Sequence, residues 1–238
     1  MESRYLYAWV DFLTILFPLV FSFLPLHDPF CKKWKAFLPA LVFPAILFLC
    51  WDTWFTSMGV WGFNPRYLVG SYFYYLPVEE VLWFICIPYS CIFTYVALNF
   101  YIKKDFLDKY QKIISSTLCI ALAAIGLLHF HRIYTFITFI SLASFLGWVQ
   151  WIWKPAFLSK FYLAFLFILI PFFIVNGILT GTGIEEAIVW YNNNENLGIR
   201  IGTIPIEDTF YGMLLILMNI SIFEFLQNKK DPEGSKLK

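Results

Sequence analysis

Long apolar runs alternate with short polar connections along the whole of this 238-residue chain. Each run is about 18 to 21 residues long, which is the length that an α-helix needs to cross the hydrocarbon core of a bilayer. The runs predict seven transmembrane helices, at Tyr5–Leu24, Ala36–Phe55, Val81–Tyr101, Ile113–Phe130, Ile133–Trp153, Phe161–Thr180 and Thr209–Leu226. The first run is too long for the apolar core of a signal peptide, so we expect it to be retained.

The composition also favours a membrane protein. Hydrophobic residues make up 60% of the chain and charged residues 14%, whereas a soluble domain is about one quarter charged. Because the apolar runs have helical rather than strand length, the predicted fold class is an all-α integral membrane protein. No basic patch carries a nucleic-acid-binding motif, and the cysteines and histidines show no metal-ligand spacing. We therefore expect neither a nucleic-acid partner nor a metal ion.

The basic residues are sorted by type between the two sides of the predicted membrane. All thirteen lysines fall on one side, at positions 32, 33, 35, 103, 104, 109, 112, 154, 160, 229, 230, 236 and 238. The other side carries the four arginines, Arg4, Arg66, Arg132 and Arg200. Lysine and arginine accumulate in cytoplasmic connections. With the lysine side in the cytoplasm, the N-terminus of this cell-membrane protein is expected outside and the C-terminus inside.

Two long loops lie on the non-cytoplasmic side, at Thr56–Leu76 and Gly181–Ile204. Each ends in a proline followed by two adjacent acids, Pro77-Val78-Glu79-Glu80 in the first loop and Pro205-Ile206-Glu207-Asp208 in the second. The acids sit directly before an apolar run, where charge is costly, so a function is expected of them. The alternative is that these loops are passive connectors whose acids begin a helix.

The two acidic motifs belong to an internal repeat with an offset of 128 residues. At this offset Asn64 aligns with Asn192, and the residues around them are similar. The offset spans an even number of helices, so the repeats run in the same direction across the membrane. We predict two parallel three-helix repeats joined by a linker helix, a 3+1+3 plan. The first repeat is 1–111, the linker 112–131, and the second repeat with the tail 132–238.

The four acids of the motifs, Glu79, Glu80, Glu207 and Asp208, are the candidate catalytic residues. Two acid pairs that converge near the non-cytoplasmic face repel one another, and burial favours their neutral form, so we expect at least one proton to be retained. A protonated carboxyl beside an ionised one provides a general acid and a general base. The residues alone leave open which carboxyl donates. Helix capping by acids in a first turn is the alternative.

A second group of residues is expected to support this site. Asp52 lies between two tryptophans at the outer end of the second predicted helix. Aromatic faces stabilise a cation without trapping it, which favours a role for the aromatic residues around the motifs, although an interfacial aromatic belt is the alternative. Arginines that follow the two asparagines are candidates for holding the carboxylates. The supporting candidates are Asp52, Trp61, Asn64, Arg66, Trp190, Asn192, Arg200 and Tyr211.

At these residues the sequence resembles the lycopene cyclase domain family, small membrane cyclases that use no flavin. In the first half the similar segments are Trp51-Asp52, Gly59-Val60-Trp61-Gly62-Phe63-Asn64-Pro65 and Leu76-Pro77-Val78-Glu79-Glu80. In the second half they are Asn176-Gly177-Ile178-Leu179-Thr180-Gly181, Val189-Trp190-Tyr191-Asn192, Arg200-Ile201 and Ile204-Pro205-Ile206-Glu207-Asp208-Thr209-Phe210-Tyr211. The chain has no Gly-rich dinucleotide fingerprint, in keeping with this branch.

The resemblance implies a lycopene β-cyclase that needs no cofactor. Such an enzyme isomerises the ends of lycopene to β-ionone rings, by protonation of the terminal double bond, ring closure and loss of a proton. Its partners would be lycopene or a related linear carotenoid, the bilayer, and other membrane enzymes of carotenoid synthesis. An ε-cyclase or another polyprenoid-modifying enzyme would use the same acids. A seven-span transporter is a further alternative, because carboxylates in a membrane also relay protons.

Overall fold

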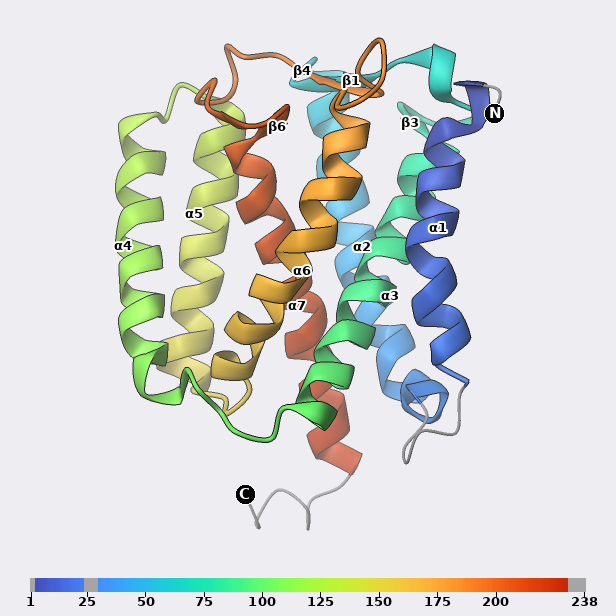
Figure 1. The fold of residues 1–238 in the computed structure, drawn as a ribbon. Coiled ribbons are helices and arrows are strands. Elements are labelled where there is room, and N and C mark those ends of the chain that lie inside the picture. Colours follow the sequence, from blue (N-terminus) through green and yellow to red (C-terminus); the bar gives the residue numbers. More distant parts are fainter. Residues whose placement is uncertain (1–2, 24–29, 231–238) are drawn as a thin grey trace.

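A computed structural model describes residues 3–23 and 30–230. Within this part, seven α-helices form a bundle that short strands cover at one end, called here the strand end (Figure 1). The helices are α1 (Leu6–Phe21), α2 (Trp34–Ser57), α3 (Val78–Tyr101), α4 (Gln111–Leu128), α5 (Ile133–Gly147), α6 (Leu158–Leu179) and α7 (Ile206–Lys230). Among the described residues, six helical stretches are long and apolar enough to cross a membrane, and α1 is a shorter apolar helix. The predicted all-α membrane fold is confirmed.

Most helix boundaries differ from the predicted ones by one to three residues, and three of the differences change the local structure. α3 begins at Val78 and α7 at Ile206, so both acid pairs lie inside the first helical turn, where the helix dipole favours negative charge. The fifth predicted helix ends as an α-helix at Gly147 and continues as a π-helix over Trp148–Trp153. Leu24, the predicted end of the first helix, and the tail lysines 236 and 238 lie outside the described residues.

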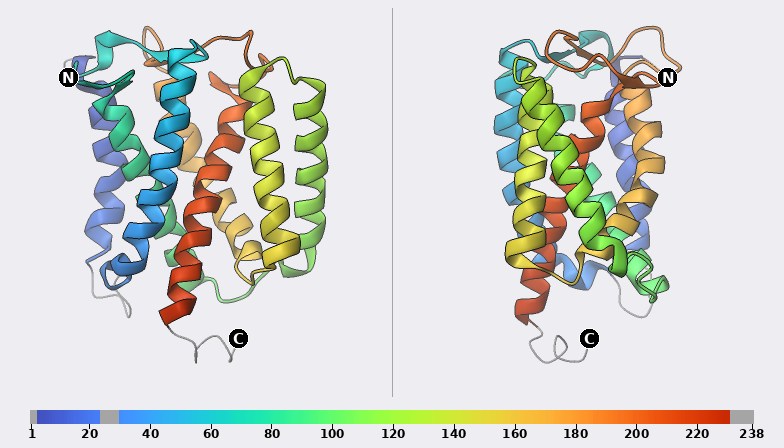
Figure 2. Two further views of the ribbon diagram at one scale, coloured as in Figure 1. Left: turned by 180° about the vertical axis from the view of Figure 1, so that it is seen from behind. Right: turned by 90° about the vertical axis from the view of Figure 1, so that its left-hand side faces the viewer.

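The outer faces of the bundle are apolar and exposed, as contact with lipid requires. The helix α4 lies at the edge of the bundle, packed against α5, and the left view of Figure 2 shows it there. Its side chains Ile120 and Leu128 are 70% and 74% exposed. The linker helix therefore contributes surface facing lipid rather than residues to the centre of the molecule.

The two repeats interlock through their second and third helices. In the first repeat α1 packs on α3, and in the second α5 packs on α7. The second helix of each repeat, however, packs against the third helix of the other, because α2 contacts α7 and α6 contacts α3. The core is thus shared between repeats, and α3 and α7 lie at its centre.

Short strands join the loops at the strand end. They are β1 (Trp61–Phe63), β2 (Tyr72–Phe73), β3 (Leu76–Pro77), β4 (Val189–Tyr191), β5 (Arg200–Ile201) and β6 (Ile204–Pro205). β1 pairs antiparallel with β4 across the two repeats, while β2–β3 and β5–β6 are equivalent hairpins that lead into α3 and α7. Each hairpin turns through a residue with positive φ, Tyr74 (54°) in the first and Gly202 (64°) in the second.

The pairing of β1 with β4 follows the repeat. Gly62 lies opposite Trp190, which is its own counterpart at the offset of 128 residues. Hydrogen bonds on either side are reciprocal, because the Asn64 amide donates to the Ile188 carbonyl and the Asn192 amide to the Val60 carbonyl, both at 2.8 Å. The approximate two-fold axis of the molecule therefore passes between Gly62 and Trp190.

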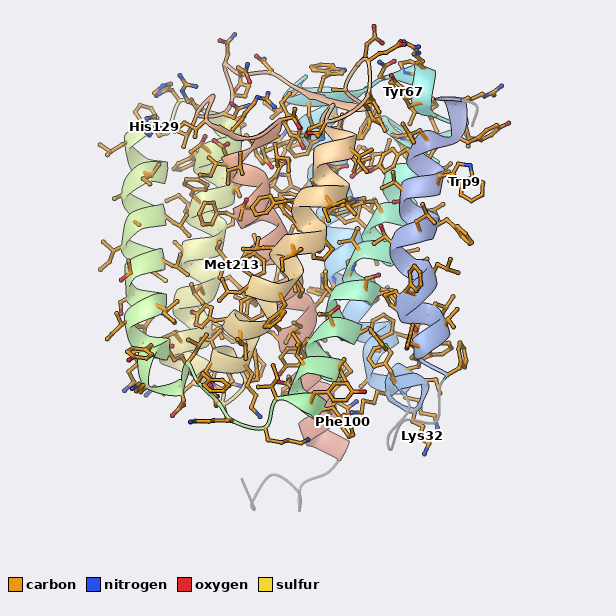
Figure 3. The ribbon with its side chains drawn as sticks, viewed as in Figure 1. Trp9, Lys32, Tyr67, Phe100, His129 and Met213 are labelled. Atoms are coloured by element: carbon orange, nitrogen blue, oxygen red, sulfur yellow. The ribbon has the colours of Figure 1, made fainter. Side chains whose placement is uncertain are left out.

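Basic residues separate to the two ends of the bundle. The lysines from Lys32 to Lys160 lie at the end away from the strands, either in the segments that join helices or in the first turn of α2, α4 and α6. Figure 3 shows Lys32 at that end and Tyr67 and His129 at the strand end. Arg4 and Arg132 each donate to backbone carbonyls of the strand-end loops, Arg4 to Val69 and Arg132 to Asn193.

Candidate active site

The acidic motifs are held in place by local backbone geometry. Pro77 has φ −65° and ψ 153°, an extended conformation that ends β3 and starts α3 at the next residue. The amide of Val78 donates to the Ser71 carbonyl at 2.9 Å, closing the hairpin loop. The amide of Ile206 makes the same bond to Ile199 at 3.0 Å. Because the two acids that follow are adjacent in a helix, their side chains point about 100° apart.

The first acid of each pair points at the loop that precedes it. Glu79 Oε1 accepts a hydrogen bond from the Val69 amide at 2.6 Å, and Glu207 Oε1 accepts one from the Leu197 amide at 2.7 Å. Glu207 Oε1 also accepts the Thr135 hydroxyl at 2.6 Å. Both side chains are completely buried. These two acids pair with backbone donors of the loops, and this arrangement holds the loops in position.

The second acid of each pair faces a shared cavity at the strand end. Glu80 and Asp208 both line this cavity, whose volume is about 50 Å³, enough for a few water molecules. Its aromatic wall consists of Tyr7, Trp61, Phe63, Trp83, Tyr134, Phe172, Tyr191 and Tyr211. The repeats therefore bring together one acid from each motif, and the cavity lies between α3 and α7.

The two cavity acids have different partners. Glu80 Oε2 accepts the Tyr7 hydroxyl at 2.6 Å, and the Asp52 carboxyl lies beside Glu80 in the wall of the same cavity. When two buried carboxyl groups lie side by side, repulsion between their charges favours a state in which the pair keeps one proton. The geometry of the Asp52–Glu80 pair therefore favours one shared proton beside the cavity.

Asp208 is surrounded by hydroxyl donors instead. Tyr134 donates to Oδ1 at 2.5 Å, and Tyr191 donates to Oδ2 at 2.8 Å. Burial and the neighbouring Asp208 raise the pKa of Tyr191 well above its ordinary value, so this hydroxyl keeps its proton and donates it. A carboxylate can accept both hydroxyl hydrogens, and each of these two hydrogen bonds stabilises the anion.

The asymmetry comes from two substitutions between the repeats. Tyr191 corresponds to Phe63 in the first repeat, which has no hydroxyl. Asp52 corresponds to Thr180, whose hydroxyl donates to the Asn176 carbonyl at 2.8 Å. The first repeat thus offers its cavity acid a second carboxyl, whereas the second repeat offers a second hydroxyl.

Several polar atoms at the cavity have no partner within the described part of the chain. They are Asp52 Oδ2, the Trp83 indole nitrogen and the Tyr211 hydroxyl, all on residues that line the cavity. Buried polar groups are nearly always paired, and exceptions often mark functional sites. Around them the rings pack edge to face, with centroids 5.0 Å apart for Trp61 and Tyr134 and 5.3 Å for Trp51 and Tyr211.

The remaining predicted residues of the first loop lie outside the cavity. Arg66 pairs with Glu185 at 2.5 Å, which raises the Arg66 pKa, and it contacts no acid of the motifs. Asn64 donates to Glu186 at 2.9 Å. Contrary to the prediction, this arginine does not hold the motif carboxylates. The loop acids Glu185 and Glu186 lie closer to it and are exposed to solvent. Arg66 and Asn64 instead link the two loops.

In the second loop, Tyr191 lines the cavity, whereas the predicted residues Trp190, Asn192 and Arg200 do not. Trp190 is 46% exposed and covers Gly62, on the outside of the β1–β4 pair. Asn192 caps the turn after β4 by accepting the Asn194 amide at 3.1 Å. Arg200 stacks over the Tyr191 ring at 5.9 Å, so it reaches Asp208 only through that tyrosine.

Three hydroxyls contact the cavity acids, those of Tyr7, Tyr134 and Tyr191. The sequence reasoning missed Tyr7 and Tyr134, and it placed Tyr191 in a segment similar to the family but not among the site residues. Tyr7 and Tyr134 are equivalent residues on α1 and α5, but they are 127 residues apart rather than 128. Because the first helices of the two repeats are offset by 127 rather than 128 residues, a search at one fixed offset does not align these two tyrosines. Aligning each helix separately would have paired them.

The chain matches the model of a known protein family. A protein family described as Lycopene cyclase matches the chain over residues 4–98 and 131–226, in two tandem regions. The two regions contain α1–α3 and α5–α7, and α4 lies between them. Searches of curated proteins and of solved structures found no match.

Proposed function

Because the chain belongs to the lycopene cyclase family, we propose that it is a lycopene β-cyclase acting by acid–base chemistry. It would convert the ends of lycopene to β-ionone rings, giving γ-carotene and then β-carotene. The observation that carries this proposal is the shared cavity, where an acid of each motif meets aromatic walls. Together these groups supply a proton and stabilise the cation that results.

The reaction begins at the Asp52–Glu80 pair. The shared proton is transferred to the terminal double bond of lycopene, leaving a tertiary carbocation and a pair of carboxylates. The π electrons of the next double bond attack this cation, which forms the ring bond and moves the positive charge to the ring. Loss of a neighbouring ring proton then restores a double bond. One proton enters and one leaves, so the product is an isomer and no electrons are exchanged.

The anion of Asp208 has the complementary role. Held by Tyr134 and Tyr191, this carboxylate stabilises the ring cation and accepts the departing proton. The choice of proton decides the ring type, because removal from the carbon that joins the chain gives a β ring and removal from the carbon on the far side gives an ε ring. Glu79 and Glu207 act as positioning residues that fix the loops beside the cavity.

The lysine distribution supports an orientation in the cell membrane. We place the lysine end of the bundle in the cytoplasm, with the N-terminus and the strand end outside. The cavity then lies close to the outer surface of the bilayer. The substrate, a linear carotenoid, is itself dissolved in the bilayer, so the enzyme meets it without a soluble carrier.

Expression in a lycopene-producing host tests this function. We expect extracts to contain β-carotene with γ-carotene as the intermediate. The single variants Asp52→Asn and Glu80→Gln should leave lycopene unchanged, because an amide cannot transfer the shared proton. If ε-ring carotenoids accumulate, the protein is an ε-cyclase rather than a β-cyclase. If the wild-type protein leaves lycopene unchanged, the proposed cyclase function is overturned.

A further inference from the structure

A second, larger cavity lies in the membrane part of the bundle. It is a groove of about 430 Å³ between α1, α3 and α6. Its lining extends along α6 from Ile168 to Ile178, which corresponds to about 15 Å at the helical rise of 1.5 Å per residue. At the rim, Leu13 and Ile174 are 52% and 63% exposed, so the groove opens towards lipid.

The surface of the groove is apolar although hydroxyl residues line it. Thr14 donates to the Val10 carbonyl, Ser90 to the Thr14 and Cys86 carbonyls, and Thr94 to the Ser90 carbonyl. Each hydroxyl is therefore directed at backbone, and none is available to a ligand as a donor. A groove of this kind suits a hydrocarbon chain better than a polar headgroup or a peptide.

The groove adjoins the catalytic cavity. Phe172 and Asn176 of α6 line both. The Phe172 ring stands at the boundary, close against α7, where a Cβ on Gly212 would come within 3.1 Å of it. An occupant that follows the groove towards the strand end therefore meets Phe172 and then Glu80 and Asp208.

We propose that this groove binds the polyene chain of the substrate, which enters sideways from the bilayer between α1 and α6 and presents its end to the two cavity acids. The inference rests on the proposed function, since only an enzyme for a long hydrocarbon needs such a path. The catalytic cavity alone is too small for a ring of the product. The end of the polyene displaces the Phe172 ring as it reaches the acids, and the groove holds the chain behind it.

Lycopene retention tests the groove independently of turnover. The protein would be purified in detergent from lycopene-producing cells as the Glu80→Gln variant, and the bound pigment measured by its visible absorption. In that background we expect Ile174→Trp and Leu13→Trp, which close the rim, to lose most of the retained lycopene. The matched control is Leu166→Trp, which changes a 58% exposed residue of α6 outside the groove and should leave retention unchanged.

The outcomes separate the two proposals. If both rim variants retain as much lycopene as the control, the proposal that the groove binds the polyene is overturned, whether or not the wild-type protein is a cyclase. Loss of retention in the rim variants only, together with a wild-type protein that cyclises nothing, supports polyene binding in the groove and overturns the proposed function. When Glu80 is restored, the rim variants should also cyclise lycopene more slowly than Leu166→Trp.

Discussion

At the scale of residues, adjacent acids in each motif have different surroundings. Glu79 accepts a backbone amide and faces a loop, whereas Glu80 shares the cavity with Asp52. Sequence analysis identified all four acids but could not separate them, because neighbouring side chains on a helix differ only in direction. That direction depends on where α3 and α7 begin, and the hydropathy pattern placed both starts three residues too late.

The same substitution at adjacent positions tests this division. Glu79→Gln keeps an oxygen that accepts the Val69 amide, so we expect cyclase activity close to that of the wild type. Glu80→Gln keeps the acceptor for Tyr7 but has no transferable proton, so we expect no product. Pigment yield per amount of folded protein measures both, and loss of activity in Glu79→Gln alone would reverse the assignment.

Tyr191 gives a second test at this scale. Tyr191→Phe makes the second repeat resemble the first, where Phe63 has the equivalent position, and it removes one donor to Asp208. A hydrogen bond to a charged group contributes about 1.5–3 kcal/mol, so we expect a turnover at least about 10-fold lower. Tyr162→Phe removes a buried hydroxyl bonded to Ser115, away from the cavity, and is the control. Equal turnover in the two variants would contradict the role of Tyr191.

At the scale of elements, the pairing of β1 with β4 joins the repeats above the cavity. The repeat itself was visible in the sequence, and so was the similarity around Asn64 and Asn192. The pairing between these segments was not, because strands of three residues leave no period that a pattern search detects. The position of Trp190 over Gly62 depends on this pairing, which explains why Trp190 was assigned to the site and lies outside it.

Gly62 is the residue that the pairing requires most. A Cβ at this position would lie 2.4 Å from the Trp190 ring, and overpacking of this kind costs about 1–3 kcal/mol. We therefore expect Gly62→Ala to lower the unfolding temperature in detergent and the cyclase activity. Adding Trp190→Ala should restore both. Gly147→Ala, where the nearest ring atom is 3.5 Å away, is the control, and a Gly62→Ala protein as stable as this control would contradict the account.

At the scale of the whole molecule, hydropathy and the repeat predicted the seven-helix bundle well. Neither predicted that α2 packs on α7 and α6 on α3, because an apolar helix face does not specify which helix it packs against. This interlocking places acids of both motifs in one cavity. Under the proposed function, it implies a single catalytic centre that would act twice on lycopene, once at each end.

The orientation is a further prediction at this scale. Cysteine introduced at Asn194, an exposed residue of the strand end, should react with a membrane-impermeant maleimide in intact cells. Cysteine introduced at Lys109, exposed at the other end, should react only after the membrane is permeabilised. Labelling above that of the wild-type protein is the measurement. The opposite pattern would place the cavity on the cytoplasmic side.

The central claim is that a proton starts the reaction, and deuterium incorporation tests it most directly. Carboxyl protons exchange with solvent, so purified protein in lycopene-containing vesicles prepared in D₂O should transfer deuterium to the substrate. Mass spectrometry should find one deuterium in the ring of γ-carotene and two in β-carotene, one for each ring closed. Cyclic products without deuterium would contradict the account.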